Sequence, residues 1–424
     1  MKERLIAGID LGSSSIRLVA AQVTVGADKR ESLTMLGAVE VPSQGISKGS
    51  VSSLEEAVSC ISGCLEQAER QIGLPITEAY VGLGGPLIQV QLAKGVVGVS
   101  RPESEIREDD VQRVLESARS VVNPANFEIL HILPRRFSID GQQTVKDPIG
   151  MQGIRLEVDA QIVQGQAAHV RNCTKAVFRT GIDISELVFT PLASAQAVAS
   201  SRQKDVGVVV VNVGAATTSI AVYEEGELIH AAVVPIGADH ITSDIAIGLR
   251  TSLEVAEQIK RTVVSAHADE IPKHEMIDLL EFGASQSEIV GSRFVSDVAQ
   301  ARVEELFERV EKELKKIQRS GLLPAGAVLT GGGVKLRGIV DVAKRVLRLP
   351  ATVAGANQLQ SPMQETLHDP AFSTAVGLVL WGFEGEREPR LGAGRGFRGA
   401  ASRGGDFMRK LSSPLKRIFK SFIP

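Results

Sequence analysis

The chain has 424 residues, of which 43% are hydrophobic and 23% are charged, as in a globular protein with more than one core. Its formal net charge of −3 gives no reason to expect nucleic acid as a partner, and no apolar run reaches the roughly 18 residues of a transmembrane helix. Cys60, Cys64 and Cys173 lack the further ligands of a zinc site, so free thiols in a reducing compartment are expected.

The first 83 residues predict an α/β unit that begins with a glycine turn. Strands over Leu5–Ile9 and Ser15–Val23 flank the turn Asp10–Ser14. Ser52 and Ser53 each stand three residues before a glutamate, which predicts a capped helix from about Leu54 to Ile72.

Residues 84–165 change pattern and predict an inserted subdomain. Several short strands and one helix near Asp109–Val122 are expected there, and the alternation of Ile154–Val163 predicts a half-buried strand. A helix near Gln166–Phe178 then returns the chain to the first unit.

The second half repeats the opening of the first. The apolar run Val206–Val213 predicts a buried strand, and it leads into the turn Val-Asn-Val-Gly-Ala-Ala-Thr-Thr at 211–218. The other expected elements are strands at 186–189, 219–223, 228–235 and 327–330, and helices at 192–201, 239–249 (to Leu249), 253–264 (capped by Thr251), 294–319 and from about Gly338.

Three glycine-rich turns in this order predict a nucleotide site between two similar halves, because such turns present backbone N–H groups to phosphate. The candidate ligands are Asp10, Gly12, Ser13, Ser14 and Ser15 of the first turn, Asn212, Gly214, Ala215, Thr217 and Thr218 of the second, and Gly331, Gly332, Gly333 and Lys335 of the third, with Glu257 and Lys260 for the ribose and base. Asp10 is also the candidate Mg²⁺ ligand. Plain hairpins would explain each turn alone, and Glu257 and Lys260 alone would fit an ordinary i,i+3 salt bridge. No Walker A motif is present.

This arrangement resembles the actin/Hsp70/sugar-kinase superfamily, and within it the FtsA family of bacterial cell-division proteins. Pro235–Lys260 is similar to the family's segment after the second phosphate turn, and Pro191–Ser194 and Ala371–Gly377 are similar to its two connecting helices. The resemblance implies an α/β fold of duplicated ribonuclease-H-type lobes around a nucleotide cleft, with an FtsA-type insert and a C-terminal amphipathic helix.

The resemblance also implies a domain plan, ligands and partners. The plan is a first lobe at 1–83 and 166–201, an insert at 84–165, a second lobe at 202–234 and 322–384 with the adenosine loop, an FtsZ-binding subdomain at 235–321, a linker at 385–405 and a membrane-targeting segment at 406–424. The implied ligands are ATP and Mg²⁺. The implied partners are the FtsZ C-terminal tail, further copies of the chain in a polymer, anionic inner-membrane lipids and other division proteins, at the cytoplasmic face of the division site. Arg293 resembles an FtsZ-contacting arginine that precedes the long helix, and a plain surface arginine is the alternative.

The second turn departs from the superfamily pattern. Asn212 stands where aspartate is usual, and Ala215 and Ala216 replace glycines. Asparagine lacks the charge that holds metal and orients water, so we expect nucleotide binding with slow or no hydrolysis.

The C-terminal segment predicts a reversible membrane anchor. Residues 385–405 contain seven glycines and five arginines, which predicts a flexible linker. Leu415, Ile418, Phe419 and Phe422 then fall on one helix face, with Lys416, Arg417 and Lys420 toward the other sides. Between Arg387 and Lys420 the net charge is +8, which favours anionic lipid. The alternative is a tail helix that docks onto the protein's own core.

Two other classes share the glycine turns. A small-molecule kinase needs a catalytic side chain in the cleft and has no use for a lipid-binding tail. An actin-like pilus-assembly protein also binds ATP, but the terminal helix and the 235–250 segment favour the FtsA family.

Overall fold

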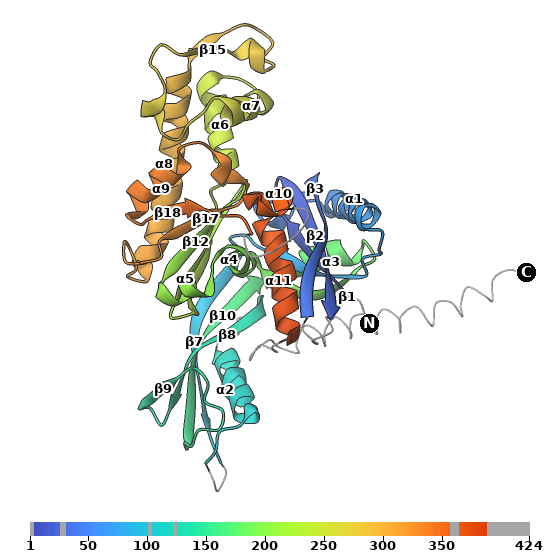
Figure 1. The fold of residues 1–424 in the computed structure, drawn as a ribbon, viewed down its shortest axis with the longest axis vertical. Coiled ribbons are helices and arrows are strands. Elements are labelled where there is room, and N and C mark those ends of the chain that lie inside the picture. The colour runs from blue at the N-terminus through green and yellow to red at the C-terminus, as the bar shows by residue number, and fades with distance from the viewer. Residues whose placement is uncertain (1–3, 26–30, 101–103, 122–124, 357–363, 388–424) are drawn as a thin grey trace, which may run out of the picture.

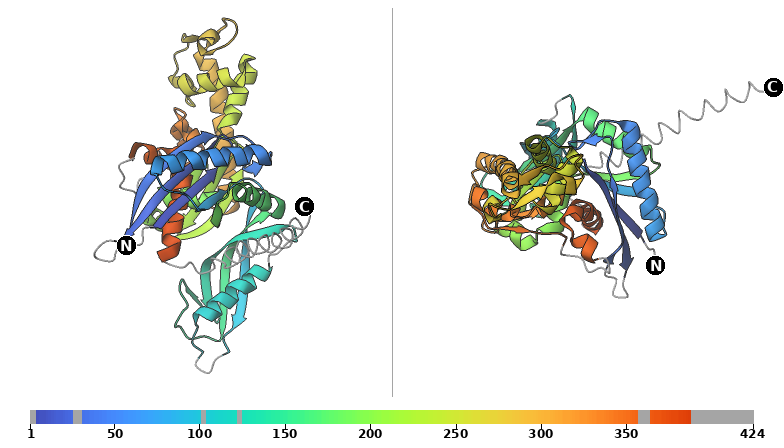
Figure 2. Two further views of the ribbon diagram at one scale, coloured as in Figure 1. Left: turned by 90° about the vertical axis from the view of Figure 1, so that its right-hand side faces the viewer. Right: turned by 90° about the horizontal axis from the view of Figure 1, so that it is seen from above.

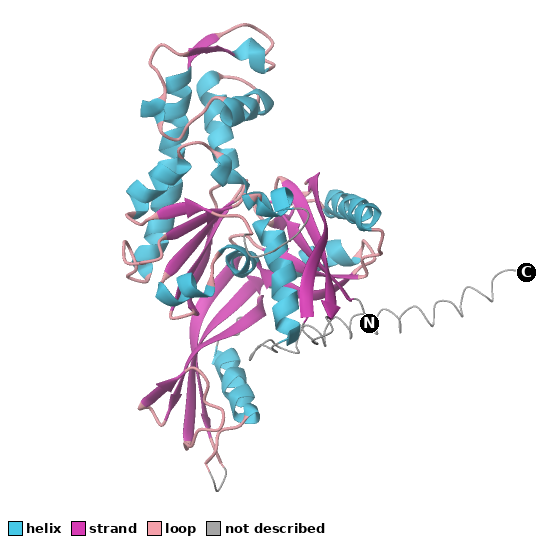
Figure 3. Cartoon of the chain, in the orientation of Figure 1, coloured by secondary structure: helices cyan, strands magenta, loops and turns pink. Residues whose placement is uncertain are grey.

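The computed structural model describes residues 4–25, 31–100, 104–121, 125–356 and 364–387. Two central β-sheets lie side by side, with a mostly helical subdomain beyond one end and a β-rich insert beyond the other (Figures 1 and 3). None of the helices in these ranges is long and apolar enough to cross a membrane. The predicted segment at 415–422 lies outside the described residues.

The first sheet forms lobe one, with strand order β11-β6-β1-β2-β3. Its strands are β1 (Arg4–Leu11), β2 (Ser15–Val25), β3 (Glu31–Pro42), β6 (Glu78–Leu83) and β11 (Asp183–Phe189). Strands β1, β2 and β3 are antiparallel neighbours, whereas β6 and β11 run parallel to β1. Helices α1 (Leu54–Ile72) and α3 (Ala167–Phe178) pack together beside this sheet (Figure 2). Ser53 is the N-cap residue of α1, but neither predicted capping bond forms, and the helix ends at Gly73 in the left-handed conformation.

The second sheet forms lobe two and repeats this topology, with strand order β14-β13-β12-β17-β18. Its strands are β12 (Val208–Val213), β13 (Thr218–Glu224), β14 (Glu227–Val234), β17 (Ala327–Thr330) and β18 (Ala351–Val353). Helix α9 (Ile339–Leu347) lies between β17 and β18 in the chain. The first three are again antiparallel and the last two parallel to the first. Strand β12 is an apolar run because it lies in the middle of the sheet with parallel and antiparallel neighbours. The duplication inferred from the two turns is thus a duplication of whole sheets.

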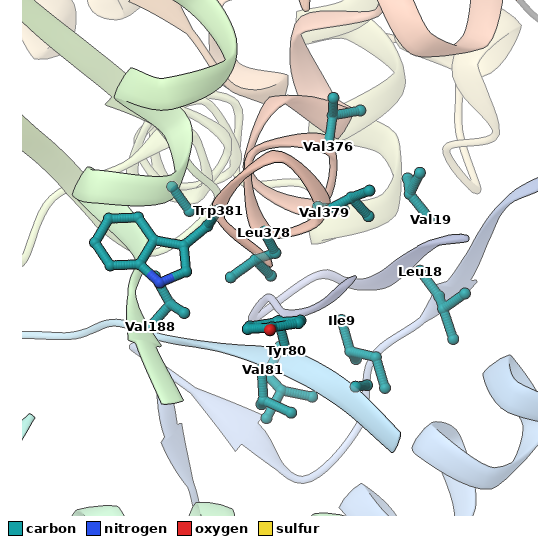
Figure 4. Close-up of a cluster of buried hydrophobic side chains, with 14 of the residues drawn as sticks. Ile9, Leu18, Val19, Tyr80, Val81, Val188, Val376, Leu378, Val379 and Trp381 are labelled. Atoms are coloured by element: carbon teal, nitrogen blue, oxygen red, sulfur yellow. The ribbon is translucent and has the colours of Figure 1, made fainter. Parts of the chain in front are cut away.

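Two helices cross between the lobes. Helix α4 (Thr190–Val198) follows lobe one and contacts β12 and β13 of lobe two, while α11 (Ser373–Arg387) follows lobe two and packs on β1, β2 and β6 of lobe one. The side chains of Val376, Leu378 and Val379 meet Ile9, Val19 and Val81 in this core (Figure 4). At the crossing, a Cβ on Gly377 would lie 1.8 Å from the carbonyl oxygen of Ala193, so only glycine permits this approach.

The insert is a four-stranded sheet of order β7-β10-β8-β9, with one helix packed against it. Its elements are β7 (Ile88–Gly98), α2 (Glu108–Val121), β8 (Phe127–Ile139), β9 (Gln143–Val145) and β10 (Arg155–Gln166). The expectation of short strands was wrong for β7 and β8, which have 11 and 13 residues. The strand expected over 154–163 is present as β10, but most of its residues are buried on both faces. Pro134 and Gly95 suggest interruptions in the sequence, but Pro134 stands at a β-bulge and Gly95 lies against α2, where a Cβ would meet the carbonyl of Val114.

The subdomain beyond lobe two contains α6 (Ala238–Leu249), α7 (Leu253–Thr262) and α8 (Ser292–Lys316), which share one apolar core with the lobe-two sheet. Ser252, not the predicted Thr251, caps α7 by accepting a hydrogen bond from the backbone of Val255. The short elements are β4 (Ile46–Ser47), β5 (Ser50–Val51), α5 (Ser201–Val206), β15 (Met276–Asp278), β16 (Ile289–Gly291), α10 (Gln364–His368) and the 3₁₀ turns η1 (Ala268–Glu270), η2 (Leu279–Phe282), η3 (Gly332–Lys335) and η4 (Pro370–Phe372).

Candidate functional site

The first glycine turn joins β1 to β2 and is built for close backbone approach. A Cβ on Gly12 would lie 2.4 Å from the carbonyl oxygen of Ser15, so a larger residue would open the turn. The Ser13 hydroxyl accepts a hydrogen bond from the backbone N–H of Gly49 at 3.3 Å, which leaves its proton free to donate. Ser14 is exposed and Ser15 is partly buried as the first residue of β2.

Asp10 lies beside this turn, directly across the hairpin from Arg17. Burial raises the pKa of the Asp10 carboxyl to about 6, and the Arg17 guanidinium acts in the opposite direction. Arg17 also pairs with Glu40 at 2.7 Å and lies 5.8 Å from the centre of the Phe372 ring. Its buried Nε has no hydrogen-bond partner among the described residues. The Arg17 guanidinium beside Asp10 is therefore only partly hydrogen-bonded within the described residues.

The second turn joins β12 to β13 and is hydrogen-bonded to the first residues of α6. The N–H groups of Ala238 and Asp239 donate to the carbonyls of Gly214 and Ala215 at 2.9 and 2.8 Å. Within the turn, the N–H of Gly214 donates to the carbonyl of Thr217 at 2.9 Å. These bonds fix the turn at the N-terminus of α6 and occupy the first two N–H groups of that helix, so only its dipole is left to favour a nearby anion.

Thr218 and Asn212 have structural partners that sequence reasoning did not anticipate. The buried Thr218 hydroxyl donates to the carbonyl of Ile236 at 2.8 Å, so it holds the hairpin and is committed within the protein. The Asn212 amide donates to the Thr374 hydroxyl of α11 at 3.0 Å. The Asn212 amide oxygen also lies against Gly331, since a Cβ added to Gly331 would be only 2.2 Å from it. Asn212 thus joins β12, the glycine loop and α11.

The third turn follows β17 and brings bare backbone next to the second. Gly331 has a φ of +90° and its N–H donates to the carbonyl of Pro370 at 3.0 Å. A Cβ on Gly333 would clash with Val213 at 2.5 Å, whereas the exposed Gly332 has nothing nearer than 3.9 Å on that side. Lys335 pairs with Asp369 at 2.6 Å. The loop lies beside β12, with Gly331 and Gly333 buried and Gly332 and Lys335 exposed.

Glu257 and Lys260 form a salt bridge at 2.5 Å, and both also contact the Thr242 hydroxyl of α6. Hydrogen bonds from Lys260, Thr242 and Arg261 hold the pKa of Glu257 below its ordinary value against the effect of burial. The Lys260 ammonium also donates to the carbonyl of Ala238 at 3.3 Å, and the Ala238 Cβ is 3.2 Å from the Cβ position of Gly333. The salt bridge that the sequence allowed is present, and it stands next to the glycine loop.

The structure therefore brings the second turn, the third turn and the Glu257–Lys260 pair together, and Phe372 connects this group to Arg17 of lobe one. Sequence reasoning missed Arg17, Thr374 and Asp369. A charged residue inside the apolar strand 15–23 was the one available signal for Arg17.

The residues present fit a magnesium-bound adenine nucleotide. The turns offer backbone N–H and hydroxyl donors, the exposed Gly332 leaves room beside it, and a partly satisfied guanidinium stands beside Asp10. No group of three metal-ligating side chains exists in the described ranges, so Mg²⁺ would depend on Asp10, phosphate oxygens and water.

Arg293 lies far from these turns in the chain and belongs to a different element. It is the second residue of α8 and does not precede that helix, as the sequence had suggested, because α8 begins at Ser292. Its guanidinium pairs with Asp269 at 2.5 Å. The predicted membrane-contacting residues from Leu415 to Phe422 lie outside the described part of the chain.

Comparison with protein families gives two matches. The model described as "Cell division protein FtsA" matches residues 209–377, and the one described as "SHS2 domain inserted in FTSA" matches residues 85–164. Similar proteins include the cell division protein FtsA of Bacillus subtilis (36% identity over 88% of this chain and 82% of that protein), that of Pseudomonas aeruginosa (33% over 90% of each) and that of Escherichia coli K12 (30% over 98% of each).

Solved structures share the fold at low sequence identity. The PilM-PilN type IV pilus biogenesis complex matches with a TM-score of 0.63 and 17% identity, over 89% of this chain and 98% of that one. MreB5 of Spiroplasma citri bound to ADP matches with a TM-score of 0.50 and 12% identity, over 88% and 94%. These likenesses concern the fold alone. With the SHS2 match, they confirm the predicted actin-like α/β architecture with an FtsA-type insert.

Proposed function

The chain belongs to the FtsA family of cell division proteins, and from that premise we propose that it is an ATP-binding scaffold that polymerises on the inner membrane surface and tethers FtsZ filaments there. In this proposal Mg²⁺·ATP lies between the lobes. The first and second turns hold its phosphates, and the third turn with Glu257 and Lys260 holds the adenosine. Thr218 is left out of the ligand set because its hydroxyl donates to the Ile236 carbonyl. Lys260 is buried and bonded to Glu257, Thr242 and Ala238, so it would have to exchange one of these contacts for the nucleotide.

One observation carries the nucleotide part of the proposal. Both sheets have the same strand order, and each places a glycine turn between its first two strands, at residues 12–14 and 214–217. Two equivalent turns on two equivalent lobes form a pair of phosphate cradles, and Asn212 ties the second cradle to the glycine loop and to α11.

Weak or absent hydrolysis follows from the same geometry. Asn212 carries no charge and its amide is engaged by Thr374, so it offers neither a metal ligand of full charge nor a base for water. We therefore assign ATP a structural role in setting lobe closure and polymer competence.

The membrane and partner contacts are proposed from the sequence and the family. Leu415, Ile418, Phe419 and Phe422 would enter the lipid interface, and Lys416, Arg417 and Lys420 would contact anionic headgroups. Weak attachment of single molecules would be multiplied by polymerisation. The FtsZ tail would bind the subdomain at 235–321, with Arg293 at its surface, and other division proteins would be recruited to the same assembly.

Co-sedimentation tests this function. The full chain is mixed with Mg²⁺·ATP, anionic vesicles and FtsZ, singly and in combination, and the pellet is quantified. We expect FtsZ in the vesicle fraction only when the chain is present, and more of both proteins with ATP than without. Equal recovery of FtsZ with and without the chain would contradict the tethering role.

The two alternatives are less well supported. The pilus-assembly structure is 17% identical, well below the FtsA relatives, so its likeness stops at the fold. A small-molecule kinase needs a catalytic side chain in the cleft, where Asn212 is neutral and hydrogen-bonded.

A further inference from the structure

The insert touches both lobes, although the chain connects it to lobe one alone. Strand β7 starts soon after β6 ends, and β6 is aligned with β1 so that Gly82 lies opposite Asp10. Strand β10 leads directly into α3 of lobe one. The body of the insert also packs on β14 of lobe two (Figure 1).

Three polar contacts join the insert to lobe two, and we call them the brace. Gln161 of β10 donates a buried hydrogen bond to the carbonyl of Ile229 at 2.9 Å. Arg136 of β8 pairs with Glu225 at 2.6 Å. Lys146 donates to the Glu225 carbonyl at 2.5 Å. The insert thus presents cations and donors to an acidic turn.

The surrounding charges are complementary as well. Burial raises the pKa of Glu227, next to this turn, while Lys146 and Arg135 of the insert lower it. Arg135, Arg136 and Lys146 therefore face Glu225 and Glu227 across the contact.

The acidic turn is a fixed part of lobe two. The N–H groups of Glu225 and Gly226 donate to the carbonyls of Asp205 and Lys204 in α5. The neighbouring Glu224 pairs with Arg319 at 2.7 Å. A displacement of this turn is therefore passed to strand β13, and the other end of β13 is the second phosphate turn, seven residues or roughly 20 Å away.

We propose that the insert braces lobe two against lobe one and thereby positions the two phosphate turns for nucleotide, with Arg136, Lys146 and Gln161 as positioning residues. This inference rests on the proposed nucleotide site. The lobes meet at the crossing of α4 and α11, and the brace is a second point of contact that limits their rotation. Without the brace, the lobes adopt several relative orientations and only a fraction of the molecules has the orientation that binds nucleotide. The apparent affinity for nucleotide then falls in proportion to that fraction.

Charge reversal in the full chain tests the brace. The variants are Arg136→Glu, Glu225→Arg, the double variant and Gln161→Leu, and the readouts are the affinity and dissociation rate of a fluorescent ATP analogue with Mg²⁺. Each single reversal should weaken binding about twofold to fivefold and speed dissociation, as for other exposed pairs. Gln161→Leu should weaken binding about tenfold, because it orphans a buried carbonyl.

The double reversal and a matched control separate positioning from general damage. The double variant restores opposite charges and should bind more tightly than Glu225→Arg alone, although an arginine at position 225 still faces Arg135 and Lys146. Arg119→Glu removes an exposed arginine of α2 in the same insert, paired with Glu116 within the helix, and should leave binding unchanged. Circular dichroism confirms that each variant is folded.

Each outcome decides between the claims. If the parent binds nucleotide but both single reversals behave like Arg119→Glu, or bind more tightly, the brace is wrong and the nucleotide site stands. If the parent does not bind ATP, the proposed nucleotide site and the brace both fall.

Discussion

Asn212 connects the second turn, the glycine loop and α11 through one side chain. Replacing it with aspartate supplies the negative charge that a hydrolytic site uses, and the Thr374 hydroxyl can then donate to the new carboxylate. We expect Asn212→Asp to raise phosphate release from ATP several-fold over a slow parent at equal nucleotide occupancy. Brisk release by the parent, measured with a coupled phosphate assay, would contradict the structural role of ATP.

We expect the Asp10 carboxylate to lower the stability of the nucleotide-free protein at neutral pH. Its pKa is raised to about 6 by burial, so the folded state binds a proton more readily than the unfolded state. Stability therefore falls as the pH rises from about 4 through 6, and the loss persists above that range. Asp10→Asn lacks this titration and should be more stable at pH 7.5 by about 2–3 kcal/mol, with the difference gone below pH 4.

Urea unfolding at pH 3.5, 5 and 7.5 measures this effect. Asp159→Asn, at an exposed position of β10, is the control for the loss of one carboxylate. A constant difference between Asp10→Asn and the parent at all three pH values would show that the carboxyl is not desolvated.

The sequence predicted which residues lie at the glycine turns better than it predicted their hydrogen-bond partners. Gly12 and Gly331 follow strands β1 and β17, as expected, because strand–glycine patterns are local, whereas Asp10 and Asn212 lie within the last residues of β1 and β12. Thr218 could not be assigned from sequence, because its partner Ile236 belongs to a loop 18 residues away. The contact between Lys260 and Thr242 likewise depends on how α6 packs on α7.

The relative position of the two lobes depends on how closely helices α4 and α11 approach each other where they cross. Gly377→Ala would place a methyl group 1.8 Å from the Ala193 carbonyl oxygen and force the helices apart. Overpacking of this kind should cost about 2–3 kcal/mol of unfolding free energy. It should also weaken nucleotide binding, since α11 carries Thr374.

Gly63→Ala is the matched control for this prediction. Gly63 is an interior glycine of α1 with nothing within 4 Å of its Cβ position. The substitution should raise stability by about 0.5–1 kcal/mol through helix propensity. Chemical denaturation of both variants distinguishes the two effects, and equal unfolding energies would mean that the helix approach is looser than the structure shows.

Helices and central strands were well predicted, including α2 and β10 of the insert, whereas the lengths of β7 and β8 were not. Periodicity located α1, α2, α3, α6 and α7 within a few residues, because each buries one face. The strands of the insert were underestimated since β8 contains a proline and a bulge, and sequence patterns read such features as strand ends. Strand β3 was missed, and its alternating exposure marks it as an edge strand.

At the scale of the whole molecule, attachment to lipid should depend on the last 19 residues. We expect the full chain to float with anionic vesicles and the chain truncated after residue 405 to remain in the dense fraction. Three cations near the headgroups contribute about 1 kcal/mol each, so salt should weaken flotation.

Phe419→Asp within the full chain refines this test. The substitution removes one apolar contact and adds a negative charge that anionic headgroups repel, so flotation should fall well below that of the parent. Lys312→Gln in α8 removes a cation elsewhere and serves as the control. Undiminished flotation of the truncated chain would place lipid binding in another part of the molecule.

The duplication of lobes was predictable because the same pattern, strand–glycine turn–strand, occurs twice. The two connecting helices were expected from the family resemblance, but the shared strand order was not, because it depends on pairings between distant segments such as Gly8 with Tyr80 and Val209 with Ala327.

The most direct measurement is a crystal structure of the full chain with Mg²⁺ and a non-hydrolysable ATP analogue. The proposal predicts triphosphate density between residues 12–15 and 214–217, the metal beside Asp10, and the adenosine against Gly331–Gly333 near Lys260. An analogue bound elsewhere, or lobes packed together with no ligand between them at saturating nucleotide, would contradict it.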